Sequence, residues 1–256
     1  MTQYAIPGPA HRQALPAERA SAACHPIYPP GPVGGLGNRP EFGATLLPEP
    51  DVGFLFMMCR NPEIGLGASA LDDAAKALSA EAIAIDAVAE VETKSQPFDG
   101  EGRPTILFER HVFSRLTRRR FDRAHPDIAN PDAGGYGSAA GQYGRLERAF
   151  KLAPSAALKS ASWGRFQIMG ENHKATGFDT VQGFVAAMAR SELEHLKAFV
   201  AFVGAHKAMA QALRKHDWAT FARLYNGPGY AKNAYDTKMK SAYEQRKKAA
   251  AAARQP

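Results

Sequence analysis

The alternation of apolar and polar positions predicts helices over most of the chain beyond its N-terminal quarter. The stretch 69–92 is rich in Ala and contains no Gly or Pro, so we expect two helices that meet near Ser79, which would cap the second. In this second helix Ile85 and Val88 belong to one apolar stripe. Glu92 follows them at helical intervals and should therefore lie on the side that faces the core.

Helical spacing also dominates from about residue 142 to near the C-terminus. Apolar residues at intervals of three and four predict one long helix over 179–204, which Asp179 opens through an Asp-x-x-Gln box and Gly204 ends. Shorter helices are expected at 206–216, at 217–226 and after residue 230.

Residues 93–113 break the helical pattern. Turn-forming residues come first and a β-prone run to Phe113 follows, which predicts a small hairpin or irregular lobe. In such a strand Glu109 would share one face with Leu107 and His111. The next expected elements are a basic helix at 114–123 and a polar loop at 124–142. The fold class is therefore mainly α, with one small β element.

Residues 1–68 are rich in Pro and Gly and show no sustained helical or strand period, which predicts an irregular N-terminal arm. The apolar run at 51–59 is either one strand docked on the main body or a stray hydrophobic patch. We therefore divide the chain into the arm, a helical domain at 69–250 and a tail at 251–256.

The charge of the chain is concentrated near its C-terminus. The whole sequence has 32 Lys and Arg against 25 Asp and Glu, a balance of +7, whereas the part from His206 onward has eleven against three, a balance of +8. Such a region suits nucleic acid, an anionic membrane face or an anionic wall polymer, and it is also compatible with a solvated helix face. Because no DNA- or RNA-binding motif accompanies the charge, no nucleic acid partner is expected.

Composition argues against several other classes of protein. Cys24 and Cys59 form no CxxC pair and have no His-rich spacing beside them, so neither a disulfide framework, a metal site nor a cofactor is expected. The first residues lack the pattern of a secretory signal, which predicts synthesis in the cytoplasm. The longest apolar run is too short to span a bilayer.

Two glutamates are candidates for acid-base chemistry. Glu92 ends an apolar stripe, where desolvation should favour its neutral form, as a general acid requires. The alternative is a helix-end side chain that reaches solvent. Glu109 could position water or brace a binding site, but a salt bridge to a nearby arginine explains it equally well.

The next candidate binding residues are polar side chains that have apolar or aromatic neighbours in the sequence. Gln167 stands between Phe166 and Ile168 in "SASWGRFQIMG", and its amide must bond to the backbone or to a ligand, because an unpartnered buried amide costs about 1–3 kcal/mol. The cluster "LYNGPGYAKNAYD" contains Tyr225, Asn226 and Tyr230, residue types that bind sugars through ring faces and paired amide groups.

Three pieces, "AVAEVET", "RPTILFERHVF" and "SASWGRFQIMG", occur in this order and precede "YNGPGYAKNAYD". Together they resemble the N-acetylmuramidase domain of bacteriophage endolysins, which is related to goose-type lysozymes and lytic transglycosylases. The resemblance covers roughly 70–246. It implies an α+β, lysozyme-like fold and cleavage of the β-1,4 bond between N-acetylmuramic acid and N-acetylglucosamine in peptidoglycan strands.

The resemblance also implies residue roles. Glu92 matches the catalytic glutamate, and Tyr225 matches the tyrosine that lytic transglycosylases place against their catalytic acid. Gln167 matches a glutamine that lines the sugar site. Glu109, Asn226 and Tyr230 are further substrate-binding candidates on their residue type and position alone. By this resemblance we expect action on the cell wall after release from the host cytoplasm, by a monomer. The basic C-terminal region should add weak electrostatic contact with anionic envelope polymers.

One departure from the family pattern affects the expected activity. Such domains commonly read Glu-Ser-Gly-Gly at the catalytic turn, whereas this chain reads "ETKS" and so lacks the glycines that reach positive φ without strain. An inactive peptidoglycan-binding relative therefore stays open as an alternative. A lytic transglycosylase that gives 1,6-anhydro products also stays open, because the sequence assigns no second catalytic carboxylate.

Overall fold

The structure is a computed structural model that describes residues 62–92 and 96–253. The arm up to residue 61, with the run at 51–59 and both cysteines, lies outside the described residues, as do 93–95 of "ETKS" and the last three residues. The helices are α2 (Ala68–Leu78), α3 (Ala82–Glu92), α4 (Arg110–Leu116), α5 (Gln142–Leu152), α6 (Pro154–Lys159), α7 (Val181–Arg190), α8 (Glu192–Ala205), α9 (Lys207–Arg214), α10 (Trp218–Asn226) and α11 (Tyr235–Ala252). Short 3-10 helices are η1 (Ala139–Gly141), η2 (Gly170–Asn172) and η3 (Pro228–Asn233).

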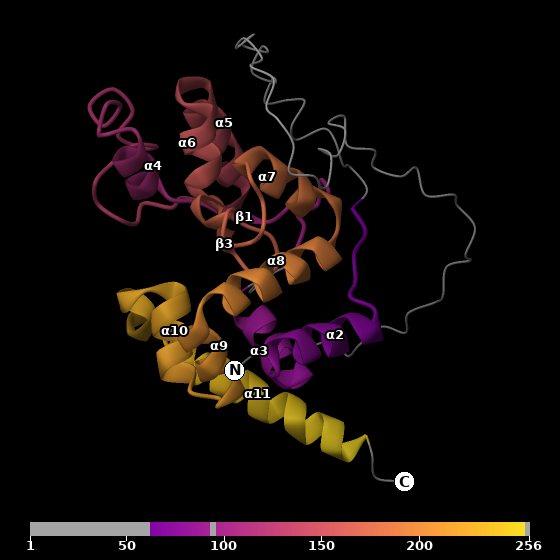
Figure 1. The fold of residues 1–256 in the computed structure, drawn as a ribbon. Coiled ribbons are helices and arrows are strands. Elements are labelled where there is room, and N and C mark those ends of the chain that lie inside the picture. The colour runs from indigo at the N-terminus through magenta and orange to yellow at the C-terminus, as the bar shows by residue number, and fades with distance from the viewer. Residues whose placement is uncertain (1–61, 93–95, 254–256) are drawn as a thin grey trace, which may run out of the picture.

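The helices are arranged in two parts. In Figure 1 the sheet and α4 to α7 lie in the upper part, α2, α3, α9, α10 and α11 lie in the lower part, and α8 crosses between them. Helix α3 packs against both α2 and α11. Its side chains at Ile85, Val88 and Ala89 are fully buried, so the predicted apolar stripe is confirmed. This packing fixes the helix that ends at Glu92.

A three-stranded antiparallel sheet joins two distant segments of the chain. Strand β1 (Ile106–Phe108) pairs with β2 (Ala161–Trp163), with Ile106 opposite Trp163, and β2 pairs with β3 (Ile168–Met169). The mainly helical fold with one small β element is confirmed. However, the stretch "SASWGRFQIMG" interrupts the region that was expected to be helical, because Trp163 and Ile168 are buried as paired strand residues.

The turn between β2 and β3 depends on two residues with positive φ. Gly164 has φ +68°, and a Cβ at this position would lie 2.7 Å from the ring of His195, so glycine is required for both reasons. Gln167 has φ +47°. Helical spacing could not reveal this hairpin, since the turn is only four residues long and its backbone is set by these two positions.

Three local predictions near the start of the domain were wrong. Ser79 ends α2 in the left-handed region, with φ +51°, instead of capping α3. Glu109 does not continue the strand but precedes α4 as its N-cap residue, so it does not share a strand face with Leu107 and His111. No helix spans 114–123, because α4 ends at Leu116 and is followed by Arg118 and Arg119, which have positive φ.

The long helix predicted at 179–204 is also divided. Its N-cap is Thr180 instead of Asp179, and its hydroxyl accepts a hydrogen bond from the Gly183 N–H at 3.1 Å. The first helix, α7, ends before Ser191, which has an extended backbone. The side chain of Ser191 caps α8, and α8 continues through Gly204 to Ala205. Ser191 favours a break because its hydroxyl satisfies an N–H of the following helix.

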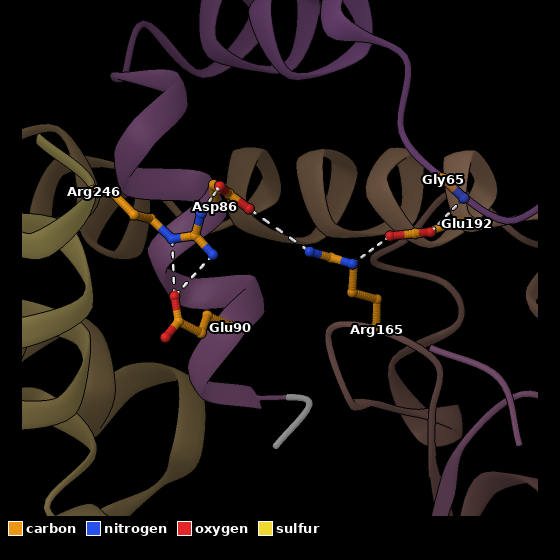
Figure 2. Close-up of polar contacts among 6 residues, drawn as sticks. All are labelled: Gly65, Asp86, Glu90, Arg165, Glu192 and Arg246. Carbon is orange, nitrogen blue, oxygen red and sulfur yellow. Dashed lines mark hydrogen bonds and ion pairs between the residues drawn. The ribbon is translucent and has the colours of Figure 1, made fainter. Parts of the chain in front are cut away.

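A network of charged side chains ties α3 to its neighbours. Figure 2 shows Arg165 between Asp86 of α3 and Glu192 of α8, with Arg246 of α11 bound to Asp86 and Glu90 on the other side. The Gly65 N–H also donates to Glu192, at 2.7 Å. Only 4% of the Glu192 side chain is exposed, so its charge depends on these donors.

We expect Arg165→Gln to lower the free energy of unfolding by about 3 kcal/mol, because it leaves the buried Glu192 carboxylate without its guanidinium partner. Urea unfolding followed by circular dichroism measures the change. The control is Arg246→Gln, which removes a more exposed guanidinium and should cost about 1 kcal/mol. An equal loss in both variants would contradict this assignment.

Candidate functional site

Glu92 combines surface access with a desolvated carboxyl group. Part of its side chain reaches the surface, while protein atoms surround the carboxyl. Burial raises the pKa of Glu92 from 4.5 to about 7, and a hydrogen bond from Asn226 partly opposes this increase. The environment predicted for Glu92 is thus confirmed, and a large fraction of the group carries a proton near neutral pH.

Asn226 is the residue that holds the Glu92 carboxyl. Its Nδ2 donates to Glu92 Oε1 at 2.9 Å from the last residue of α10. Its Oδ1 is buried and has no hydrogen-bond partner among the described residues. An amide can donate to one oxygen of a neutral carboxyl and accept from the O–H of the other. In this structure the bond from Nδ2 favours the ionised form of Glu92.

Tyr225 lies near Glu92 but bonds elsewhere. Its buried hydroxyl donates to the Phe166 carbonyl at 2.6 Å and so joins α10 to the turn between β2 and β3. Burial raises the pKa of Tyr225 well above its usual value, and the charge of Glu92 adds to the effect. The hydrogen bond to Glu92 thus comes from Asn226, while Tyr225 fixes the end of α10.

Glu109 supplies a second, partly buried carboxyl. Its Oε2 lies 3.1 Å from Nδ1 of His111. Burial raises the pKa of the Glu109 carboxyl, while the nearby His111 and a hydrogen bond from Tyr136 oppose this change. Glu92 is the last residue of α3 and Glu109 is the N-cap residue of α4, so the two carboxyl groups come from different elements of the fold.

Tyr235 lies close enough to both carboxyl groups for their charges to affect its pKa. It is the first residue of α11, and burial raises its pKa, with further contributions from the charges of Glu92 and then Glu109. Sequence reasoning named neither Tyr235 nor Tyr136 as a site residue. The only signal for Tyr235 was its place in the Tyr- and Asn-rich cluster after α10.

The amide of Gln167 is used within the hairpin. Its Nε2 donates to the carbonyls of Thr105 at 3.1 Å and Gly164 at 2.8 Å. Its Oε1 accepts from the Ser162 hydroxyl at 2.7 Å. Both N–H groups are thus bonded to backbone oxygens, which explains an amide among apolar neighbours without a ligand. A role in sugar binding stays a prediction.

Tyr230 belongs to η3, the segment between α10 and α11. It is a half-buried residue of η3 that packs against the core, and its N–H donates to the Gly227 carbonyl at 3.2 Å. Its predicted part in substrate binding rests on its residue type and on the resemblance.

The described residues contain neither a metal-binding cluster nor a membrane-spanning helix. Within 62–92 and 96–253, no group of three or more His, Cys, Asp or Glu side chains could hold a metal ion. No helix in these ranges is both long and apolar enough to cross a membrane.

Comparisons with known proteins place this geometry in context. A sequence model of the N-acetylmuramidase family matches residues 81–247, which include all the candidate site residues. The crystal structure of a Burkholderia AP3 phage endolysin is similar, with a TM-score of 0.66 and 45% sequence identity over 72% of each chain. The comparison with curated proteins gave no match.

Proposed function

Because the chain belongs to the N-acetylmuramidase family, we propose that it cleaves the β-1,4 bond between N-acetylmuramic acid and N-acetylglucosamine in peptidoglycan, with Glu92 as general acid. The observation that carries this proposal is the pKa of about 7 at Glu92, a carboxyl that burial keeps protonated. A lysozyme-type glycosidase needs such a group beside the scissile bond.

Glu92 transfers its proton to the glycosidic oxygen while the bond from that oxygen to C1 of the muramyl residue breaks. The N-acetylglucosamine unit leaves with a new hydroxyl group, and positive charge develops at C1 and the ring oxygen of the muramyl residue. Asn226 Nδ2 then stabilises the Glu92 carboxylate through the hydrogen bond already present. The proton donor and the group that accommodates its charge are therefore adjacent.

Glu109 is suited to position the attacking water. Its carboxyl precedes α4 and is adjacent to His111, and Tyr235 lies within reach of the charges of both glutamates. Water that attacks C1 gives hydrolysis and a reducing muramic acid end. If the muramyl 6-hydroxyl attacks C1 instead, the product is a 1,6-anhydro end and the enzyme is a lytic transglycosylase.

The remaining polar residues are assigned to substrate binding and support. Tyr230 and Asn226 contribute a ring face and an amide to the sugar site. Gln167 acts by holding the hairpin, and through it the Phe166 carbonyl that anchors Tyr225. This arrangement gives Tyr225 an indirect part, through the position of α10 and therefore of Asn226.

The similarity to a phage endolysin supports a bacteriolytic role for the whole chain. We assign the protein to synthesis in the host cytoplasm, release through a separately encoded pore and action on the wall as a monomer. The basic C-terminal region, which carries a balance of +8 from His206 onward, assists approach to anionic envelope polymers.

The pH dependence of the rate tests the role of Glu92. We expect kcat/KM on soluble peptidoglycan fragments to fall above a pH of about 7, as the acid loses its proton. In Asn226→Ala the pKa of Glu92 rises, because the hydrogen bond that favours its ionised form is lost, so the alkaline limb moves to higher pH. The control Asn233→Ala removes an exposed amide from η3 and should leave the profile unchanged. An unmoved limb in Asn226→Ala would contradict this account of the acid.

A further inference from the structure

Arginines are concentrated at the end of α4 and in the turn that follows it, a segment that we call the arginine turn (residues 115–123). It contains one acidic residue, Asp122, and the side chains of its arginines are all exposed at least in part. These arginines are Arg115, Arg118, Arg119, Arg120 and Arg123. No Lys occurs in the turn, whereas the C-terminal basic region is rich in Lys.

Most of this charge is not neutralised. Arg115 pairs with Glu171 at 2.7 Å and Arg119 pairs with Asp122 at 3.2 Å. For the other three arginines of the turn, no ion pair forms with any residue that the structure describes. The turn is thus a compact, exposed patch of positive charge at the edge of the fold.

The backbone of the turn is unfavourable for arginine. Arg118 and Arg119 have φ of +53° and +62°, in the left-handed region. The Arg119 N–H donates to the Ser114 carbonyl at 2.7 Å, a helix-ending pattern in which glycine is the usual left-handed residue. A left-handed residue other than glycine costs roughly 1–2 kcal/mol. The sequence thus keeps two guanidinium groups where glycine would fit better, and the ion pair of Arg119 is too exposed to compensate.

We propose that the arginine turn binds a phosphate-bearing lipid surface. Guanidinium groups bind phosphate through two parallel hydrogen bonds, which makes arginine better suited than lysine to this contact. The large exposed apolar side chains of the described residues, Ile64, Tyr136 and Leu193, all lie outside the turn. Binding is therefore electrostatic, without insertion, and the turn has no exposed aromatic ring on which nucleic acid bases could stack.

The position of the turn makes it a contact separate from the C-terminal basic region. In Figure 1 α4 and α11 lie at opposite ends of the molecule. The arginines of the turn form none of the contacts described for Glu92, Asn226 or Glu109. Adsorption through this face therefore adds a membrane contact that is independent of glycan cleavage.

Co-sedimentation of the full chain with vesicles tests the proposal. We expect binding to vesicles of phosphatidylglycerol and phosphatidylcholine, no binding to pure phosphatidylcholine, and loss of binding at high salt. Arg118→Gly with Arg119→Gly should weaken binding about 30-fold, because each basic residue near an anionic surface contributes roughly fivefold. The midpoint of thermal unfolding should stay equal or rise, since glycine relieves the left-handed backbone.

Two further variants make the test specific. Arg120→Gln with Arg123→Gln removes the same charge without changing the left-handed positions, and we also expect it to bind about 30-fold more weakly. Lys240→Gln with Lys248→Gln removes two exposed charges from α11 and should change binding by less than about threefold. Both arginine variants should digest lipid-free peptidoglycan at the wild-type rate.

Several results would overturn the proposal. Unchanged vesicle binding in both arginine variants would do so, as would an equal loss in the α11 control, which would reduce the effect to net charge. Displacement by inorganic phosphate at the same phosphate concentration would indicate a site for single anions. Equally tight binding to a single-stranded oligonucleotide, lost in the same variants, would assign the turn to nucleic acid.

Discussion

Glu92→Gln should reduce cleavage of peptidoglycan by about 10³-fold, because an amide cannot donate a proton to the leaving oxygen. The introduced amide can still accept the hydrogen bond from Asn226, so the geometry of the site should be retained. Release of soluble fragments from purified peptidoglycan measures the change. The matched control is Glu90→Gln, two residues earlier on α3, where the carboxylate is half exposed and pairs with Arg246. Activity of Glu92→Gln within tenfold of wild type would remove Glu92 from the mechanism.

The same variant should be more stable than wild type at alkaline pH. The pKa of Glu92 is raised in the folded protein from 4.5 to about 7, so the folded state binds the proton more tightly than the unfolded chain. Wild-type stability therefore falls as pH rises from about 4.5 through about 7. The difference between the two pKa values corresponds to a loss of at most roughly 3 kcal/mol in the free energy of unfolding of wild type. The variant does not undergo this loss, because its amide does not ionise. Urea unfolding at pH 5 and pH 8 should show a small advantage at the lower pH, where the carboxyl of the unfolded chain is already partly ionised, and nearly the full advantage at the higher one.

Glu109→Gln should lower the rate of hydrolysis by about 10²-fold, because the amide positions and activates water less well than the carboxylate. We also expect the remaining products to contain a larger fraction of 1,6-anhydro ends, since the muramyl 6-hydroxyl then competes better with water. Product analysis by mass spectrometry measures both effects. The pH profile of Glu109→Gln distinguishes the roles of the two glutamates. The fall in rate at alkaline pH is set by Glu92 and should therefore persist in this variant.

The control for Glu109 is Glu147→Gln on α5, an exposed carboxylate paired with Lys151. It should have wild-type rates and products. If Glu109→Gln lowers the rate only in proportion to a loss of folded protein, Glu109 braces the fold through His111 and Tyr136 and has no role in positioning water.

The part of the site that could be predicted from sequence depends on local periodicity. The stripe through Ile85 and Val88 placed Glu92 on the buried side of its helix, and the raised pKa follows from that burial. The ordered motifs indicated the N-acetylmuramidase family, and the match over 81–247 confirms it. Local pattern was sufficient here because one helix carries both the stripe and the acid.

The partners of Glu92 depend on contacts between distant segments. Asn226 is 134 residues from Glu92, and no pattern within α10 reveals that its amide faces this carboxyl. The bonds of Gln167 likewise require β1 to pair with β2, because one acceptor is the Thr105 carbonyl. Residue types indicated that Gln167 needed partners, but only the assembled sheet identifies them.

The most direct test of the account is mass spectrometry of the soluble products from purified peptidoglycan digested with wild type and with Glu92→Gln. Wild type should give products with reducing muramic acid ends, and Glu92→Gln should give no such products above background. Mainly 1,6-anhydro ends from wild type would contradict hydrolysis and assign transglycosylation. No fragments from either protein, or the same fragments from both, would contradict cleavage by Glu92.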